Sequence, residues 1–517
     1  MGVRADLARA GQRSLVRRTG WPLAAAPVVT LAVMLWGIRS QPYWGDEADT
    51  VSALQRSLPQ LLRMTTHVDA VHGLYYLVLW PVVQVAGTGE LATRLPSAAA
   101  MAAAAAGVAA LGCRLRSRRT GLWAGLVFAA LPMIALQGHD ARPYAMVTAV
   151  AVLACWQVIR VADDPRPGRL TLYGLLLVLL GYLELLALLL VAAHAVTLIG
   201  WRRGEGPWRG LPGRLRRSRL ARRWLVTVAG AGAAVLPVAV FGWLQRVQIA
   251  WIPGLSPAAL VDVVQSLALG SALSAVPVAL LAVLGAITGD AAPGRPGRAR
   301  TSWLVRAIRV GAWSGGGRRG LGWLAVPWLV LPPLALLAAS ELKPVYNSRY
   351  IVFCLPAVAL VAGAGLAALG WAVRAAVLAV IVLLAMPAQL ALRAPRVDLT
   401  AAASALAARQ RPGDAVIFPG KSIPPWYLVY PWAFGRLREI GMASSGADAG
   451  RLYAPSVLPP VVRARERGIG RIWVVEIGAW QDPAGYLAPG FHLVNVLRPG
   501  RGATWLGLYQ HRPDPAR

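Results

Sequence analysis

Long apolar runs without charged residues recur along the first three quarters of this sequence. A helix needs about 20 apolar residues to cross the hydrocarbon core of a bilayer, and most of these runs are close to that length. Of the 517 residues, 57% are hydrophobic and 15% are charged, whereas a soluble domain carries about 25% charged residues. We therefore predict a mainly α-helical, polytopic membrane protein. The predicted spans are 22–38, 95–112, 121–137, 144–161, 170–182, 184–200, 224–243, 272–289, 321–339, 349–368 and 371–391.

The distribution of arginine predicts the orientation. The net charge is +31, and basic residues cluster in the N-terminal segment 1–21 and in the loops 114–119, 202–223 and 295–319. Short basic loops face the cytoplasm, so we place these segments inside and expect no nucleic-acid partner. All these basic loops face the cytoplasm together only if the short apolar segment 73–87 does not cross the membrane. We therefore predict an interfacial or re-entrant helix there, and about 11 transmembrane helices in total.

The same reasoning divides the chain into regions. A cytoplasmic basic N-terminus (1–21) precedes a transmembrane domain (22–391), in which 39–93 is a long first external loop with juxtamembrane helices. The tail, 392–517, falls outside the cytoplasm. We expect the protein in the cell membrane, with its functional face extracytoplasmic.

The tail differs in kind from the rest of the chain. An amphipathic helical pattern over 398–409 is followed by β-like runs at 415–418, 472–476 and about 504–509. Alternating helix and strand signals are typical of a small α/β domain. We therefore predict such a domain at the C-terminus.

An acidic pair, Asp46 and Glu47, follows the first predicted span directly. A carboxylate close to a bilayer surface is partly desolvated, which raises its pKa and suits it to act as a base. Adjacent carboxylates also hold divalent cations, and Asp140 is the candidate third ligand if a metal is used. The alternative is an ordinary solvated start of a loop.

The same loop continues with Asp69, His72 and Tyr75, just before the predicted interfacial helix. These residues are candidates for substrate binding, and the spacing is not diagnostic of a metal site. The alternative is that aromatic residues simply anchor a helix at the interface. Arg94 then opens the second span.

Further polar residues gather at other turns on the predicted external face. Arg142 lies against the positive-inside trend and can hold a phosphate in bidentate fashion, or it can pair with Asp140. Trp251 beside amides suits sugar stacking or lipid anchoring. Glu184 and His194 are ionisable residues in or beside spans, which favours a functional role. The remaining candidates for substrate binding are Tyr144, Gln248, Lys343, Tyr346, Arg349 and Tyr350.

The order of these motifs resembles the GT-C superfamily of membrane glycosyltransferases. The closest branch is family 39-like, with protein O-mannosyltransferases and aminoarabinose transferases, in an actinobacterial-type, Ala- and Arg-rich sequence. The resemblance covers about 20–390 and rests on Asp46-Glu47, Asp69…His72…Leu74-Tyr75-Tyr76, Arg94-Leu95-Pro96-Ser97, Asp140-Ala141-Arg142-Pro143-Tyr144 and Arg349-Tyr350. Two positions depart from the family pattern, which has Glu at Asp140 and His-Pro-Pro at His72-Gly73. The second departure indicates a distinct subgroup.

The resemblance implies a transferase that uses a polyprenyl-phosphate monosaccharide as donor. Mannose is the sugar that the family favours, with arabinose or another pentose next. In an inverting transfer, Asp46 would deprotonate the acceptor, while Glu47 and Asp140 would orient the acceptor or a divalent cation. Arg142, Lys343 and Arg349 would stabilise the leaving phosphate. The acceptor is a glycan, a lipid or a protein.

Two other classes of function remain open. A transporter or flippase for a lipid-linked glycan would show inverted repeats and charges near mid-membrane, whereas here the polar residues gather at one predicted surface. A non-catalytic assembly protein would bind a partner through the tail. It would not need acids and cations at several separate loop ends.

Overall fold

The protein is described by a computed structural model. It describes residues 23–201, 213–267, 272–287, 320–394, 399–420, 422–478, 480–483, 485–500 and 504–512. The predicted basic N-terminus, the loop 295–319 and the first part of 202–223 lie outside these residues.

The chain forms two compact units. The helical unit consists of Met1–Trp36 with Arg94–Leu392, and the mixed unit of Gly37–Thr93 with Arg393–Arg517. The mixed unit thus combines the segment after the first apolar helix with the C-terminal region.

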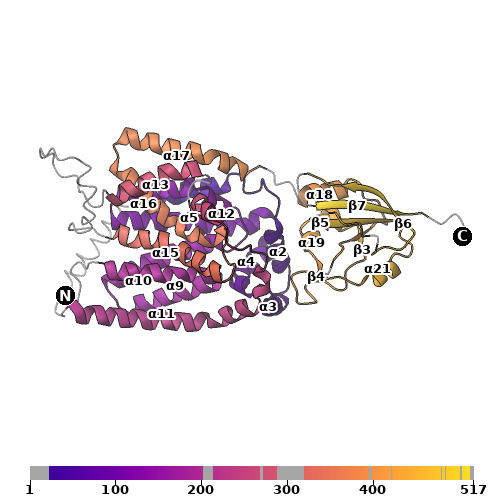
Figure 1. The fold of residues 1–517 in the computed structure, drawn as a ribbon, viewed down its shortest axis with the longest axis horizontal. Coiled ribbons are helices and arrows are strands. Elements are labelled where there is room, and N and C mark those ends of the chain that lie inside the picture. Colours follow the sequence, from indigo (N-terminus) through magenta and orange to yellow (C-terminus); the bar gives the residue numbers. More distant parts are fainter. Residues whose placement is uncertain are drawn as a thin grey trace. The chain divides into compact units, whose positions relative to one another are not determined.

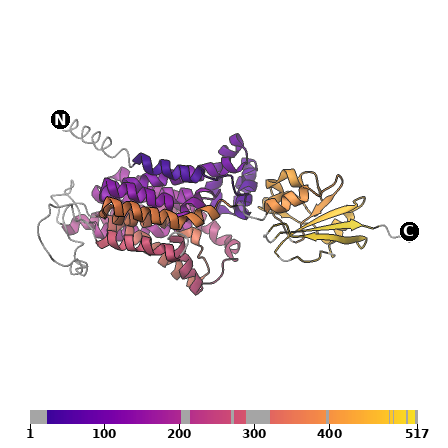
Figure 2. The ribbon, with the colours of Figure 1, turned by 90° about the horizontal axis from the view of Figure 1, so that it is seen from above.

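Helices cover every predicted span within the described residues of the helical unit, and they run side by side in both views (Figure 1 and Figure 2). Six of them are long and apolar enough to cross a membrane, or seven if the bent pair α6 and α7 is one span. A multi-pass membrane protein is therefore confirmed, while the count of 11 spans stays a prediction. The elements are Leu23–Leu35, α5 (Glu90–Leu115), α6 (Arg118–Ala130), α7 (Pro132–Gly138), α8 (Tyr144–Asp163), α9 (Pro167–Leu183), η2 (Leu185–Leu189), α10 (Leu190–Gly200), α11 (Gly213–Leu244), η3 (Arg246–Ile249), α12 (Pro257–Leu267), α13 (Ala272–Ile287), α15 (Leu321–Leu342), η5 (Ser348–Cys354), α16 (Leu355–Ala368) and α17 (Trp371–Ala391).

Helix α16 is the centre of the helical unit. Its apolar window with η5 is 89% buried, against 17% for the windows of α11 and α17, which lie at opposite edges of the unit in Figure 1. Glycines allow α16 to approach its neighbours closely. A β-carbon on Gly363 would lie 2.4 Å from the Ala124 backbone nitrogen in α6, and one on Gly365 would lie 2.1 Å from the Leu281 carbonyl oxygen in α13. Small residues of this kind are typical of helix contacts in membranes.

Within the described residues, one predicted span is broken rather than continuous. The predicted span 121–137 is two helices, α6 and α7, which meet at an angle of 67°. The break falls at Leu131, whose backbone is extended, and at Pro132, which starts α7. A proline fits the first turn of a helix but not its interior, so the chain ends one helix and starts another. Two other helices, α10 and α16, begin directly after short 3-10 segments, η2 and η5.

Three helices form the N-terminal part of the mixed unit: α2 (Gly45–Leu54), α3 (Leu58–His67) and α4 (Gly73–Ala86). Ser57 begins α3 with a capping box to Gln60. The Trp80 indole donates to the Arg56 carbonyl oxygen at 2.9 Å, and the Gln84 amide donates to that of Leu54 at 3.1 Å, so α4 is fixed against the α2–α3 corner. Helix α4 has 14 residues, about 21 Å, which is shorter than a hydrocarbon core of about 30 Å.

The C-terminal part of the mixed unit contains a five-stranded mixed sheet in the order β3-β1-β5-β7-β6. Strand β1 is parallel to β3 and β5, and β7 is antiparallel to β5 and β6. The three predicted β-like runs are β1, β5 and β7, and the predicted helix is α18. The elements are α18 (Leu399–Ala407), β1 (Ala415–Ile417), β2 (Ser422–Ile423), α19 (Trp426–Val429), α20 (Pro431–Phe434), β3 (Arg438–Glu439), β4 (Ala454–Pro455), α21 (Pro459–Arg465), β5 (Arg471–Ile477), β6 (Phe491–Leu497) and β7 (Thr504–His511).

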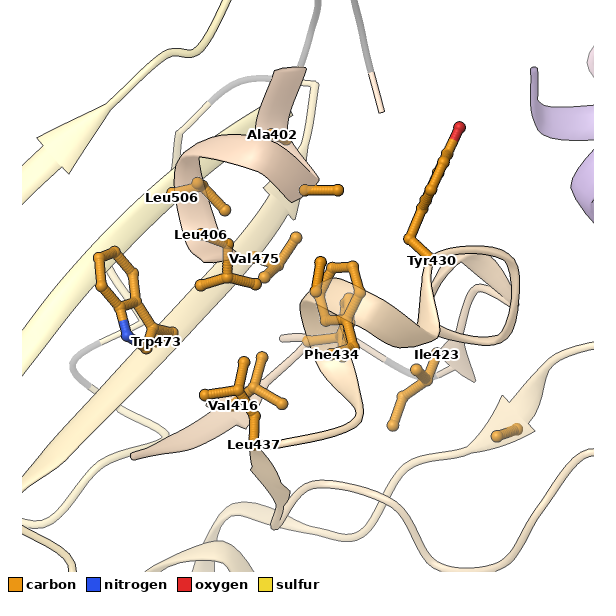
Figure 3. Packing of buried hydrophobic residues seen from close by; sticks show 14 residues of the cluster. Ala402, Leu406, Val416, Ile423, Tyr430, Phe434, Leu437, Trp473, Val475 and Leu506 are labelled. Carbon is orange, nitrogen blue, oxygen red and sulfur yellow. The ribbon is translucent and has the colours of Figure 1, made fainter. Parts of the chain in front are cut away.

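Hydrophobic side chains pack on both faces of this sheet. One cluster joins Leu406 of α18 and Phe434 of α20 to Trp473 and Val475 of β5 (Figure 3). The other joins Ile472 and Val474, the alternate residues of β5, to Val462 of α21 and to other buried residues. Because successive side chains of a strand point to opposite faces, β5 contributes to both clusters. The predicted small α/β domain is thereby confirmed as a fold.

Candidate active site

The acidic pair lies in the first turn of α2, in the mixed unit. Trp44 is the N-cap, and Asp46 and Glu47 follow Gly45, the first residue of the helix. Negative side chains are stabilised at a helix N-terminus by the backbone dipole. The Glu47 side chain is buried, whereas Asp46 is partly exposed. Asp46 is therefore the more accessible of the two to a second molecule.

A third carboxylate belongs with Asp46. Asp49 lies three residues further along α2, and residues three apart share one face of a helix. Asp49 is also partly exposed. Sequence reasoning missed it because the segment looked like a loop, in which a spacing of three residues carries no meaning. Recognising a helix start at Trp44 would have revealed it.

Asp69 and His72 come together as their spacing suggested. Asp69 has a φ of 60° and precedes the 3-10 turn η1 (Ala70–His72). Its carboxylate pairs with the His72 Nδ1 atom at 3.2 Å and accepts a hydrogen bond from the Tyr76 hydroxyl at 2.6 Å. Tyr76 therefore holds Asp69. Tyr75 is fully buried in α4 and packs against Tyr76, with 6.2 Å between ring centroids.

A second cluster, in the helical unit, brings Arg142 and Arg349 to one carboxylate. Arg142 is buried at the corner between α7 and α8, and Arg349 lies in η5. Glu184, the N-cap of η2, interacts electrostatically with both guanidinium groups. Glu184 entered the sequence analysis only as an ionisable residue beside a span. No spacing in the sequence indicates that it lies near the two arginines.

Two tyrosines complete this arginine cluster. The Tyr144 and Tyr350 rings lie 6.2 Å apart, and the Arg349 guanidinium carbon lies 6.0 Å from the centroid of the Tyr144 ring. The Arg349 Nε atom donates to the Asn347 side-chain oxygen at 3.3 Å. Asp140 is buried in the same corner. The cluster therefore presents two cations framed by aromatic rings, which is an arrangement suited to an anion.

The other predicted residues of the helical unit lie in different contacts. Lys343 lies over the Trp243 ring, 5.2 Å from its centroid, where Arg246 also stacks at 4.7 Å. The Tyr346 hydroxyl donates to Asp262 at 2.9 Å, and the Gln248 amide donates to Gln245 at 3.4 Å. Trp251 is exposed, and Arg94 is buried near the start of α5. These contacts do not join Lys343 to the arginine cluster.

The residues named for a divalent cation do not form a ready site. Among the described residues, no group of three or more His, Cys, Asp or Glu side chains is placed to hold a metal ion. Asp46 and Glu47 are also neighbours on a helix, so their side chains leave the axis about 100° apart.

Comparisons with known proteins bear on the fold. Residues 74–208 match the family described as dolichyl-phosphate-mannose-protein mannosyltransferase. ArnT from Cupriavidus metallidurans is 15% identical over 95% of this chain and 98% of its own, with a TM-score of 0.56 when bound to undecaprenyl phosphate and 0.58 in the apo state. The apo Archaeoglobus fulgidus oligosaccharyltransferase is 11% identical over 89% of this chain and 69% of its own, with a TM-score of 0.43. No curated protein matches the sequence.

The comparisons define the class of protein. The chain is a multi-pass membrane protein with the fold of ArnT, and the predicted resemblance to the GT-C glycosyltransferases is confirmed. The likeness to ArnT extends over nearly all of both chains. The family match covers a shorter region that contains Tyr75, Arg94, Asp140, Arg142 and Tyr144.

Proposed function

We propose that this protein is a membrane glycosyltransferase that takes a monosaccharide from a polyprenyl-phosphate donor. The observation that carries the proposal is the likeness to ArnT, whose structure holds undecaprenyl phosphate and which is similar over 95% of this chain. The carboxylates of α2 and the arginine cluster supply the two kinds of group that such a transfer needs. One kind accepts a proton, and the other binds an anion.

Asp46 is the proposed base. It is more exposed than Glu47 and shares a helix face with Asp49. The acceptor oxygen would bond to the anomeric carbon while the bond from that carbon to the phosphate oxygen breaks. The electron pair of that bond leaves with the polyprenyl phosphate, and the acceptor proton passes to Asp46. The configuration at the anomeric carbon is inverted because the acceptor attacks on one side of that carbon and the phosphate leaves from the other.

Arg142 and Arg349 are the proposed phosphate ligands. Guanidinium groups match phosphate oxygens in bidentate fashion and stabilise the negative charge that grows on the leaving group. Glu184, which interacts electrostatically with both arginines, would compete with the phosphate for them. Tyr144 and Tyr350 would frame the same group. Lys343, which lies over Trp243, would act further along the donor.

The remaining predicted residues would bind the substrates or shape their site. Asp69, held by His72 and Tyr76, would orient the acceptor beside Asp46, together with Glu47. Exposed Trp251 would stack on a sugar or lie among lipids. We assign supporting roles in substrate binding to Tyr75, Arg94, Asp140, Gln248 and Tyr346.

The proposed sugar is mannose, with a pentose as the second candidate. The family match favours mannose, and the likeness to ArnT keeps an arabinose-type sugar in view. The proposed acceptor is a glycan, lipid or protein outside the cytoplasm. This follows from the positive-inside rule, which places the N-terminus in the cytoplasm and both the α2 carboxylates and the C-terminal domain 392–517 outside. The transmembrane domain would comprise 22–391.

The test is transfer by the purified full-length protein in nanodiscs. The donor is polyprenyl-phospho-mannose labelled in the sugar, or the corresponding arabinose donor, and the acceptors are polysaccharide and protein fractions from a deletion strain. Asp46→Asn should lower the rate at least about a hundredfold, since a positioned base contributes roughly 10²–10⁴-fold. Asp482→Asn, in the C-terminal region, is the matched control and should transfer at the wild-type rate. A wild-type rate for Asp46→Asn would contradict the mechanism.

The same assay separates the alternatives. A flippase would move the labelled donor between the leaflets of a vesicle without a glycosylated product. A non-catalytic assembly protein would do neither. Label in an acceptor fraction, dependent on Asp46, supports the transferase alone.

A further inference from the structure

The loop 443–453 of the C-terminal region docks on the corner between α2 and α3. The Arg56 side chain, which is buried, donates hydrogen bonds to the carbonyl oxygens of Gly446, Arg451 and Leu452, at 3.2, 2.7 and 3.4 Å. The backbone carbonyl of Arg56 accepts a hydrogen bond from the Trp80 indole of α4. One residue therefore links α2, α3, α4 and the loop within the mixed unit.

Glycines in the loop make this docking close. Gly450 has a φ of 63°, and a β-carbon there would lie 3.2 Å from the Arg63 Nε atom of α3. At Gly446, a β-carbon would lie 2.8 Å from the Arg451 carbonyl oxygen. The loop also closes on itself, because Ser445 donates to Asp448 at 2.6 Å and the Arg451 amide donates to Gly446 at 2.8 Å. It is thus a shaped element rather than a loose connection.

Two further contacts hold the C-terminal region to α2. The Gln55 amide donates to the Leu428 carbonyl oxygen at 3.4 Å, and the Tyr430 hydroxyl donates to that of Tyr43 at 3.4 Å. The Tyr43 carbonyl lies just before α2, and the Gln55 amide lies just after it. The C-terminal region is therefore positioned along the helix that carries Asp46 and Asp49.

Tyr453 ends the docked loop, directly before β4, which pairs with β2. Its hydroxyl is hydrogen bonded to the Asp49 carboxylate, and Asp46 and Asp69 lie within electrostatic reach. Burial and these three carboxylates raise the pKa of Tyr453 well above its ordinary value, so the hydroxyl keeps its proton and donates. The residue is still 40% exposed. Part of it is therefore open to a second molecule.

We propose that Tyr453 is a specificity-determining residue of the transferase, contributed by the C-terminal domain, that binds a carbohydrate acceptor beside Asp46. The exposed ring offers a face for a sugar to stack on, and the hydroxyl fixes Asp49 on the same helix face as the base. The inference rests on the proposed function. It assigns the C-terminal domain a part in acceptor binding, with Arg56 as the residue that positions the loop.

The experiment measures half-saturating concentrations in the nanodisc assay with the full chain. Tyr453→Ala should raise the half-saturating amount of the polysaccharide fraction about tenfold, the factor expected from one lost stacking contact, and leave that of polyprenyl-phospho-mannose unchanged. Tyr453→Phe keeps the ring and should raise the half-saturating amount of polysaccharide less than Tyr453→Ala does. Tyr509→Phe, which removes a tyrosine–aspartate bond to Asp482 elsewhere in the domain, is the matched control and should match the wild type.

Limited proteolysis separates contact from folding. Arg56→Met removes the hydrogen bonds to the loop, and it should both expose 443–453 to protease and raise the half-saturating amount of acceptor. Tyr453→Ala should keep the loop protected. A released loop in Tyr453→Ala would overturn direct contact with the acceptor.

Failure of this inference is distinct from failure of the proposed function. If the wild type transfers and Asp46→Asn does not, but Tyr453→Ala has the wild-type requirement for polysaccharide, the inference alone is wrong. A preference of the wild type for the protein fraction over polysaccharide would also overturn it. If the wild type transfers to no fraction, the proposed function is wrong.

Discussion

At the proposed anion site, one carboxylate, that of Glu184, would oppose binding of the phosphate. It is the charged neighbour that Arg142 and Arg349 share. A donor phosphate would compete with Glu184 for the same guanidinium groups. The affinity of the arginine cluster for the proposed phosphate would therefore depend on a residue that need not touch the substrate.

Replacing Glu184 by Gln should strengthen binding of polyprenyl phosphate. The substitution keeps the shape and removes the competing charge, so product inhibition by polyprenyl phosphate should appear at roughly fivefold lower concentration. This factor corresponds to ~1 kcal/mol, the interaction of two unit charges at about 4 Å in water. Inhibition of transfer at increasing polyprenyl phosphate is the measurement.

The control for this prediction is Glu341→Gln, a change at an exposed glutamate near the end of α15. It should leave product inhibition as in the wild type. Weaker inhibition in Glu184→Gln would mean that the carboxylate orients the arginines more than it competes with phosphate.

At the residue scale, the sequence predicted contacts between residues that are close along the chain better than contacts between residues that are far apart along it. The approach of Asp69 to His72 follows from their spacing of three residues. The hydrogen bond from Tyr76 to Asp69 depends on the 3-10 turn before α4, and the electrostatic interaction of Glu184 with Arg142 depends on how separate helices pack. Tyr453 lies more than 400 residues from Asp49 along the chain, so no local pattern links them. The proposed roles of all these residues stay predictions.

At the scale of elements, hydropathy located the helices but not their breaks. The region 121–137 is apolar throughout, yet Pro132 divides it into α6 and α7. A hydropathy window averages over residues and is blind to a missing backbone donor. The strands β1, β5 and β7 were evident because their β-branched and aromatic residues form compact runs. The short strands β2, β3 and β4 have two residues each, too few to form a pattern.

Gly363 of α16 should tolerate alanine poorly. Gly363→Ala would force its β-carbon to within 2.4 Å of the Ala124 backbone, so α16 and α6 would have to move apart. Overpacking of this kind costs roughly 1–3 kcal/mol, and the midpoint of thermal unfolding in detergent should fall. Differential scanning fluorimetry of the purified protein measures it.

Gly230 of α11 is the matched control for that prediction. A β-carbon there meets no atom within 4 Å, and alanine is the better helix former by about 1 kcal/mol. Gly230→Ala should therefore keep or raise the midpoint. Equal effects of the two substitutions would show that helix propensity, rather than the α16–α6 contact, determines the result.

At the scale of the whole molecule, two distant stretches of chain form one unit. Residues 37–93 and 393–517 are compact together, through contacts such as those of Arg56 with the loop 443–453. The class of fold could be predicted from apolar runs and from the order of motifs. This association could not, because it depends on one arginine meeting three backbone carbonyls, and carbonyls have no signature in a sequence.

The orientation of the chain is the remaining prediction at this scale. With the N-terminus in the cytoplasm and 73–87 not crossing, an odd number of spans leaves the region after α17 outside. Alkaline phosphatase fused after residue 391 should be active, since it folds only outside the cytoplasm, and a green fluorescent protein at the same site should be dark. The opposite pair of results is expected for fusions after residue 119, in a basic loop that the positive-inside rule places in the cytoplasm. Activity at both sites would mean that an even number of spans crosses between residues 119 and 391, instead of the predicted nine. If only the fusion after residue 119 is active, then either the segment 73–87 crosses the membrane or the whole orientation is reversed, and the carboxylates of α2 would face a cytoplasmic acceptor in the second case alone.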